Sequence, residues 1–230
     1  MKKIYKKQVL VNDFMKNHIK TKNLPINEAI ESLKKISKIT SRNFLESIDV
    51  AIKLNIDTKK ETSLKGSFLL PHSQQKKVKI CVFAELEKQK DIQAHLVGGE
   101  ELIEKIKNNG IDFDICIATP LMMKKITTNK NITSILGQKG LMPNIKLGTI
   151  TDNIPKIVNN INNGMLFYKS DKAGYIHLKV GKVSQSSNEI IENINSLLEH
   201  IKANKTNQKL NFISHIHVST TMGKGFKITN

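Results

Sequence analysis

Strand-like and helix-like segments alternate between residues 71 and 159, and this alternation restricts the possible fold more than any other feature of the chain. A strand is expected at 78–82, a helix at 100–108, a second strand at 113–118 and a short helix from Thr119. Strands that alternate with helices form a parallel sheet whose faces the helices cover. We therefore predict a small α/β domain in the middle of the chain.

The two ends of the chain have a different pattern, typical of an α+β domain. The segments expected there are a helix at 27–38, a strand at 48–56, a hairpin of strands at 165–169 and 175–180, a helix at 188–202, and strands near 212–219 and 226–229. We therefore predict a discontinuous α+β domain of residues 1–70 and 160–230, into which an α/β domain of residues 71–159 is inserted.

The segment from Ile135 to Thr149 contains three glycines and Pro143 among apolar and basic residues. Glycine and proline interrupt helices and strands, so we expect an ordered loop here. No acidic residue occurs between Asp114 and Asp152, although that interval contains several lysines. A long field of one sign indicates a polyanionic partner, and a solvated basic loop explains this stretch equally well.

The chain has a formal net charge of +17 over 230 residues. This charge is typical of a protein that binds nucleic acid or an anionic membrane surface, but biased codons can also contribute, because Arg42 is the only arginine among 37 basic residues. Most of the excess lies in the two outer segments of the chain. The outer domain is therefore the predicted polyanion-binding domain. No apolar run is long enough to span a bilayer, and no membrane role is expected.

The sequence lacks the motifs of several functional classes. No G-x-x-x-x-G-K-[ST] loop, H-E-x-x-H pair or G-x-S-x-G turn is present, so neither a nucleotide cofactor nor catalysis is expected. No acidic residue or cysteine follows His200 in the chain, so His215 and His217 have none near them in sequence, which argues against a metal site formed with His200. Cys81 and Cys116 lie in apolar strand-like runs, and we expect both to be reduced core residues.

Five stretches together resemble one family, the large-subunit ribosomal protein number one, which forms the protein part of the mobile side stalk. They are ILGQKGLMPNIKLGTIT from Ile135, Leu70-Pro71-His72, LVGGEELIEKI from Leu96, YKSDKAGYIHLKVGK from Tyr168 and STTMGKG from Ser219. The resemblance covers nearly the whole chain. It implies a split α+β domain with an inserted Rossmann-like three-layer α/β/α domain, in agreement with the pattern above.

The resemblance also implies a function without catalysis or cofactor. Members of the family bind large-subunit ribosomal RNA at the stalk, assist the release of deacylated tRNA from the exit site, and in many bacteria repress translation of their own mRNA. It further implies a monomer when the protein is off the ribosome and a cytoplasmic, ribosome-bound location, or an organellar matrix.

The family's RNA-binding residues transfer to positions whose side chains are mainly small, polar or basic. Small hydroxyls and glycine allow close approach to ribose 2′-OH groups, and lysine neutralises phosphate. Lys139 and Lys146 in the 135–149 segment are expected as auxiliary RNA contacts. The expected RNA-binding residues are Phe44, Glu46, Ser47, Asp171, Lys172, Gly174, His177, Lys182, Thr220, Thr221, Met222 and Gly223.

Some positions depart from the family pattern, and two other functions stay open. Asn43 stands where many members have lysine, and Gln138, Lys139 and Ile145 replace the family's proline, arginine and proline. Lysine lacks the planar two-pronged contact of arginine, so the contact made by Lys139 is expected to differ from that of other members. The alternatives are a nonspecific basic nucleic-acid-binding protein and a nucleotide-dependent α/β enzyme.

Overall fold

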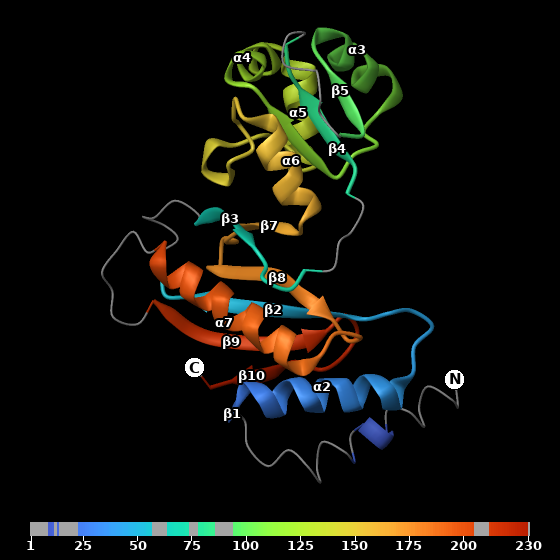
Figure 1. Ribbon diagram of the computed structural model, residues 1–230, viewed down its shortest axis with the longest axis vertical. Coiled ribbons are helices and arrows are strands. Elements are labelled where there is room, and N and C mark those ends of the chain that lie inside the picture. The colour runs from blue at the N-terminus through green and yellow to red at the C-terminus, as the bar shows by residue number, and fades with distance from the viewer. Residues whose placement is uncertain are drawn as a thin grey trace. The chain divides into compact units, whose positions relative to one another are not determined.

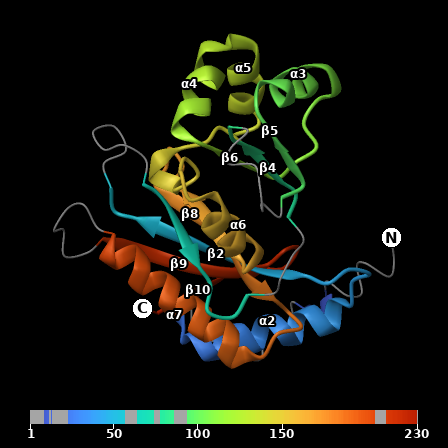
Figure 2. The ribbon, with the colours of Figure 1, turned by 45° about the horizontal axis from the view of Figure 1, so that its top comes forward.

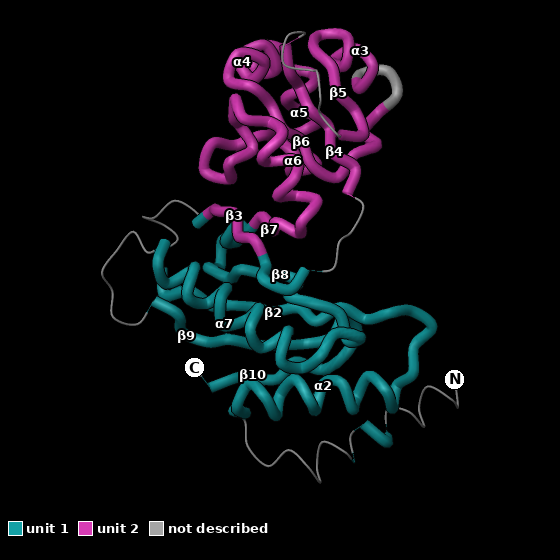
Figure 3. Tube along the Cα trace, in the orientation of Figure 1, with its two compact units in different colours: residues 1–64, 70–73, 168–230 teal, residues 65–69, 74–167 magenta. Residues whose placement is uncertain are grey.

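The computed structural model describes residues 9–11, 13, 23–56, 64–73, 78–85, 94–204 and 212–229. The chain divides into two compact units (Figure 3). Unit 1 contains Met1–Leu64, Leu70–Ser73 and Tyr168–Asn230, and unit 2 contains Lys65–Leu69 and Gln74–Phe167. These limits differ by a few residues from the predicted joints near 70 and 160. The assignment of two domains to 1–70 with 160–230 and to 71–159 stays a prediction.

Among its described residues, unit 1 is built around a five-stranded sheet and the helices α2 and α7 (Figure 1). The strand order is β1-β10-β9-β2-β8, with β1 parallel to β10 and the other pairs antiparallel. Helices α2 and α7 lie against the same face of the sheet (Figure 1). The bounds are β1 Asn23–Leu24, α2 Ile26–Thr40, β2 Ser47–Leu54, β8 Tyr175–Lys182, α7 Ser187–Ala203, β9 Ile213–Thr220 and β10 Phe226–Ile228.

The alternation of β2 shows which face of this sheet the described helices cover. Ile48, Val50 and Ile52 are fully buried beneath the helices, whereas the intervening residues are partly exposed. Helix α7 begins where Ser186 accepts a hydrogen bond from the backbone of Glu189 at 3.3 Å. Its buried stripe, which includes Ile194, packs onto this core. The predicted strand and helix are thus confirmed.

The predicted hairpin is wrong, although both of its strands exist. β7 (Met165–Lys169) pairs with β3 (Lys65–Leu69), whereas β8 pairs with β2. The connection at Asp171 turns the chain from one sheet to the other, so the sequence signal for a tight turn did not identify the strand partners.

Unit 2 is a three-layer α/β/α arrangement (Figure 2). Its parallel sheet has the order β5-β4-β6. One face packs against α3, α4 and α5, and the other packs against α6. The predicted fold class is therefore confirmed. The bounds are β4 Ile80–Phe83, β5 Leu96–Gly98, α3 Glu100–Asn109, β6 Ile115–Ala118, α4 Pro120–Thr128, α5 Lys130–Gln138 and α6 Ile154–Asn162.

Two adjacent strands bring the cysteines together. Cys81 on β4 and Cys116 on β6 are partners in register, and both are free and buried, as predicted. The interaction with Cys81 and then burial raise the pKa of the Cys116 thiol well above its ordinary value. These thiols are consequently part of the core.

The prediction that residues 135–149 form only a loop is wrong at its beginning. Ile135 to Gln138 complete helix α5, in which Leu136 is fully buried. A Cβ at Gly137 would meet no atom within 4 Å, so packing does not require glycine here. Glycine in a helix costs about 1 kcal/mol, an amount that burial of a leucine offsets. The rest is a loop with a 3₁₀ turn, η2 (Ile145–Leu147), closed by Gly148 at φ 72°.

No helix among the described residues is long and apolar enough to cross a membrane.

Candidate nucleic-acid interface

At one end of the unit 1 sheet, β2 begins and β8, β9 and α2 end, and we call this end the groove edge. In the strand register, Ser47 at the start of β2 is the partner of Lys182 at the end of β8, and Ile48 is the partner of Thr220 at the end of β9. Helix α2 ends beside them at Ser41, whose left-handed backbone (φ 40°) turns the chain sharply toward β2. This edge collects eight of the predicted RNA-binding residues: Phe44, Glu46, Ser47, Lys182, Thr220, Thr221, Met222 and Gly223.

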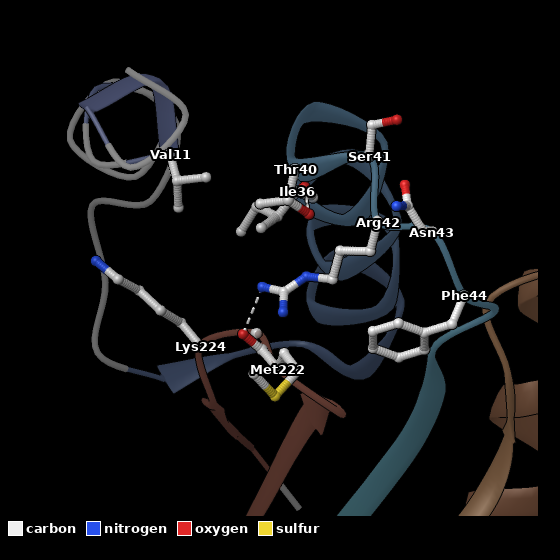
Figure 4. A pocket seen from close by; sticks show the side chains of 10 residues that line it. Val11, Ile36, Thr40, Ser41, Arg42, Asn43, Phe44, Met222 and Lys224 are labelled. Carbon is white, nitrogen blue, oxygen red and sulfur yellow. Dashed lines mark hydrogen bonds between the residues drawn. The ribbon is translucent and has the colours of Figure 1, made fainter. Parts of the chain in front are cut away.

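A groove of about 630 Å³ opens at this edge between the end of α2 and the turn after β9 (Figure 4). Phe44 and Met222 are 51% and 64% exposed, and both line this groove, so two large apolar side chains are accessible at one place. Arg42, Asn43 and Lys224 add polar and basic groups to the lining. A groove with apolar walls and cationic groups fits a partner that has both flat apolar surfaces and negative charge.

A polar network around the buried Glu46 carboxylate fixes the shape of the groove. Arg42 Nε lies 2.9 Å from Glu46 Oε1, and an Arg42 terminal nitrogen donates a hydrogen bond of 2.7 Å to the Met222 carbonyl oxygen. The Ser37 hydroxyl donates to the other carboxylate oxygen of Glu46. Arg42 thus joins the start of β2 to the turn after β9 (Figure 4). The motif comparison did not identify this residue, and its spacing to Glu46 gave no signal, because residues 42–46 are not helical.

Glu46, one of the expected RNA contacts, makes its side-chain interactions within the protein. Its side chain is only 2% exposed, and its carboxylate is paired with Arg42 and accepts a hydrogen bond from Ser37. A buried carboxylate requires such partners, because an unpaired charge in the interior is costly. Glu46 therefore organises the groove from within.

Hydrogen bonds and close packing fix the turn after β9. The Ser47 backbone N–H donates to Thr221 Oγ1 at 2.9 Å, and the Thr221 backbone N–H donates to the Ser47 carbonyl at 3.1 Å. A Cβ at position 223 would lie 2.1 Å from Thr220 Oγ1, so Gly223 fits here without displacing that buried side chain. The turn consequently presents Met222 outward.

Three other predicted residues lie at the opposite end of β8. Asp171, Lys172 and Gly174 precede Tyr175, which is seven residues before Lys182 in the same strand. That separation corresponds to about 23 Å at ~3.3 Å per residue. Asp171 Oδ1 accepts hydrogen bonds from the backbones of Ala173 at 2.9 Å and Tyr175 at 2.7 Å. This carboxylate thus shapes its own turn, and Gly174 provides the positive φ of 78° there.

The predicted site is therefore extended rather than a single cluster. His177 lies between its two ends, exposed on β8. Lys139 and Lys146 belong to unit 2 and are both exposed, at the end of α5 and in η2. No group of three or more potential metal ligands occurs among the described residues.

Burial changes the ionisation of two groups near the site. It raises the pKa of the Asp49 carboxyl, against the attraction of Lys179. It lowers the pKa of His217, with the positive charges of His215 and Lys227 acting in the same direction. His217 is consequently neutral at pH 7.

Comparison with known proteins identifies the chain. A model of the ribosomal protein L1p/L10e family matches residues 33–224, a range that contains every predicted site residue. The chain belongs to this family. Similar proteins, all described as large ribosomal subunit protein uL1, show how far the likeness extends. That of Buchnera aphidicola subsp. Baizongia pistaciae (strain Bp) is 41% identical over 233 residues, covering 99% of this chain and 96% of the relative.

Two further uL1 proteins come from other bacteria. That of Phytoplasma australiense is 41% identical over 212 residues, and that of Haemophilus influenzae is 38% identical over 213 residues. Each alignment covers 90% of both chains. The resemblance inferred from five sequence stretches is thus confirmed over nearly the whole chain, and the family assignment makes this a ribosomal protein.

Proposed function

We propose that this protein is a constituent of the large ribosomal subunit that binds ribosomal RNA of the mobile side stalk through the groove edge of unit 1. The observation that carries the proposal is the groove itself. It places exposed Phe44 and Met222 beside cationic side chains in a member of a ribosomal protein family.

The groove has the chemistry that folded RNA requires. Structured RNA is recognised mainly through its shape and its 2′-OH groups, and through stacking of bases that are not paired. The hydroxyl of Thr221 and the small Gly223 permit close approach, while Phe44 supplies a flat apolar surface. Lys182 and Lys224 are positioned to neutralise phosphate charge, which makes binding dependent on salt.

We propose two further roles on the basis of family membership. They are assistance in releasing deacylated tRNA from the exit site and repression of the protein's own mRNA through a similar RNA structure. Lys139 and Lys146 are proposed as auxiliary contacts from unit 2. The proposed function is non-catalytic, and the proposed location is on cytoplasmic ribosomes of a bacterium, because the similar uL1 proteins come from bacteria.

One pair of variants tests the groove. Met222→Asp places a negative charge where we expect RNA, and Leu121→Asp places the same charge at a similarly exposed apolar residue of α4 in unit 2. Binding to a stalk fragment of large-subunit ribosomal RNA is measured by filter retention. We expect Met222→Asp to weaken binding about tenfold or more, because like charges at an interface cost several kcal/mol, and Leu121→Asp to bind as the wild type does.

Unchanged circular dichroism of both variants separates loss of contact from loss of fold. Equal affinities of Met222→Asp and wild type would contradict the proposed groove. A shuffled duplex of equal length tests the nonspecific alternative, which predicts the same affinity for both RNAs.

A further inference from the structure

The sheet of unit 1 has a second face that no described helix of that unit covers. Because α2 and α7 both pack on the other face, the outward residues of four adjacent strands are accessible together. The strand register arranges them in three rows across the sheet. These rows are Ser219–Asp49–Lys179, Lys227–His217–Ala51–His177 and His215–Lys53–Tyr175.

Aromatic rings are concentrated at one corner of this open face. The rings of Tyr175 and His177 are stacked, with centroids 6.0 Å apart and an angle of 20° between their planes. Lys53 Nζ lies 4.6 Å from the centre of the Tyr175 ring and also donates a hydrogen bond to the Ala173 carbonyl. These contacts hold the Tyr175 ring in place, which reduces the entropy that a ligand stacked on the pair would have to offset.

The floor beside the ring pair is flat and the surrounding charge is positive. Ala51 is the strand partner of both His177 and His217, so a small side chain lies between two imidazoles. Lys53, Lys179 and Lys227 are opposed on this face by a single acidic residue, Asp49. A planar ligand that carries negative charge fits both features. An unpaired nucleotide has this combination, since a base supplies the plane and its phosphate supplies the charge.

We propose that the open sheet face binds an unpaired nucleotide of the RNA, with its base stacked on the Tyr175–His177 pair and its phosphates near the lysines of the same face. This site adds recognition of a single-stranded segment to the groove edge, and it rests on the proposed RNA-binding function. Tyr175 distinguishes this open-face site from the expected RNA-binding site, because the RNA-binding residues transferred from the family do not include Tyr175.

The test compares Tyr175→Leu with Tyr175→Phe in the full-length protein. The leucine keeps the apolar bulk but removes the ring, and the phenylalanine keeps the ring. The probe is a twelve-nucleotide oligoadenylate containing one 2-aminopurine, whose fluorescence falls when the base stacks. We expect Tyr175→Leu to bind about tenfold more weakly and without the fluorescence loss, and Tyr175→Phe to behave as the wild type does.

A change in salt concentration separates stacking from charge. Tyr175→Leu should leave the slope of log affinity against log salt unchanged, whereas Lys227→Met should reduce the slope by about 0.7 for one lost phosphate contact to a single strand. A twelve-base-pair duplex without unpaired bases should bind wild type and Tyr175→Leu equally.

Equal binding of the oligoadenylate by wild type and Tyr175→Leu would overturn the inference. Equal losses in the leucine and phenylalanine variants would also overturn it, because the ring would then not be the recognised feature. The stalk RNA fragment provides the separate check. If the wild type binds that fragment while the oligoadenylate result is negative, only the open-face site fails, and if the wild type does not bind the fragment, the proposed function fails.

Discussion

Replacing Arg42 by methionine should destabilise unit 1 more than any other single charge removal at the groove. The change leaves the carboxylate of Glu46, which is 2% exposed, with the Ser37 hydroxyl as its remaining described partner. Breaking a fully buried ion pair costs about 3–5 kcal/mol. Because the Arg42 side chain is 25% exposed, part of the pair is already solvated, and we expect a loss of about 2 kcal/mol.

The reverse change should cost less. Glu46→Gln keeps an oxygen that can accept from Ser37 and leaves a guanidinium that water can reach, so we expect a loss of about 1 kcal/mol. In the double variant no buried charge is unpaired, and its loss should be smaller than the sum of the two single losses. A coupling energy of about 1–2 kcal/mol follows from this difference.

The assay uses the distribution of tyrosines. The chain has three tyrosines and no tryptophan. Tyr168 and Tyr175 belong to unit 1, whereas Tyr5 lies outside the described residues. Urea unfolding followed by tyrosine fluorescence therefore reports the free energy of unfolding of unit 1. Lys38→Met is the matched control, because it removes a positive charge from an exposed position in the last turn of α2.

The control should change the free energy of unfolding by no more than about 0.5 kcal/mol. Additive effects of Arg42→Met and Glu46→Gln, or a loss in Arg42→Met no larger than that of the control, would refute the reasoning. RNA binding is an independent measurement of the role of the network formed by Arg42, Glu46 and the Met222 carbonyl. Because Arg42 holds the Met222 carbonyl, Arg42→Met should also weaken binding of the stalk fragment under conditions in which the variant is folded.

Two further predictions concern protonation and the core. Burial lowers the folded-state pKa of His217 below 6.5, so the unfolded chain binds the proton first and the free energy of unfolding should fall as the pH drops through 6.5. In urea titrations at pH 7.5 and 5.5, His217→Gln should show a smaller fall than the wild type. Equal pH dependence of the two proteins would contradict this role of His217. Cys81 and Cys116 should react with a thiol reagent at pH 7.5 only after denaturant is added, because both are buried, and rapid reaction of native protein would argue against their place in the core.

The elements predicted correctly are those whose burial pattern is regular. In β2 the side chains alternate between a helix-covered face and an open face, so the period of two is visible in the residues themselves. Strand β5 was not predicted, since its three residues are too few to show a period. Gly137 indicated a loop because local preference was considered without the burial of Leu136, which the tertiary structure supplies.

The residues of the candidate site stay a prediction, and their arrangement in the fold could not be read from the sequence. Motif matching placed Glu46 and Asp171 among the RNA contacts, yet both carboxylates accept hydrogen bonds or ion pairs from within the protein. A motif identifies which positions are shared and does not distinguish a group that touches a ligand from one that shapes the surface. Arg42 lies outside the transferred set, so its part in the groove required the distance to Met222.

The most direct test of the central claim is cosedimentation with large ribosomal subunits that lack this protein. Wild type and Leu121→Asp should pellet with the subunits in stoichiometric amounts, and Met222→Asp should stay in the supernatant at moderate salt. If Met222→Asp pellets as the wild type does, the groove edge of unit 1 is not the binding surface. If none of the three pellets, the protein is not a constituent of the large subunit.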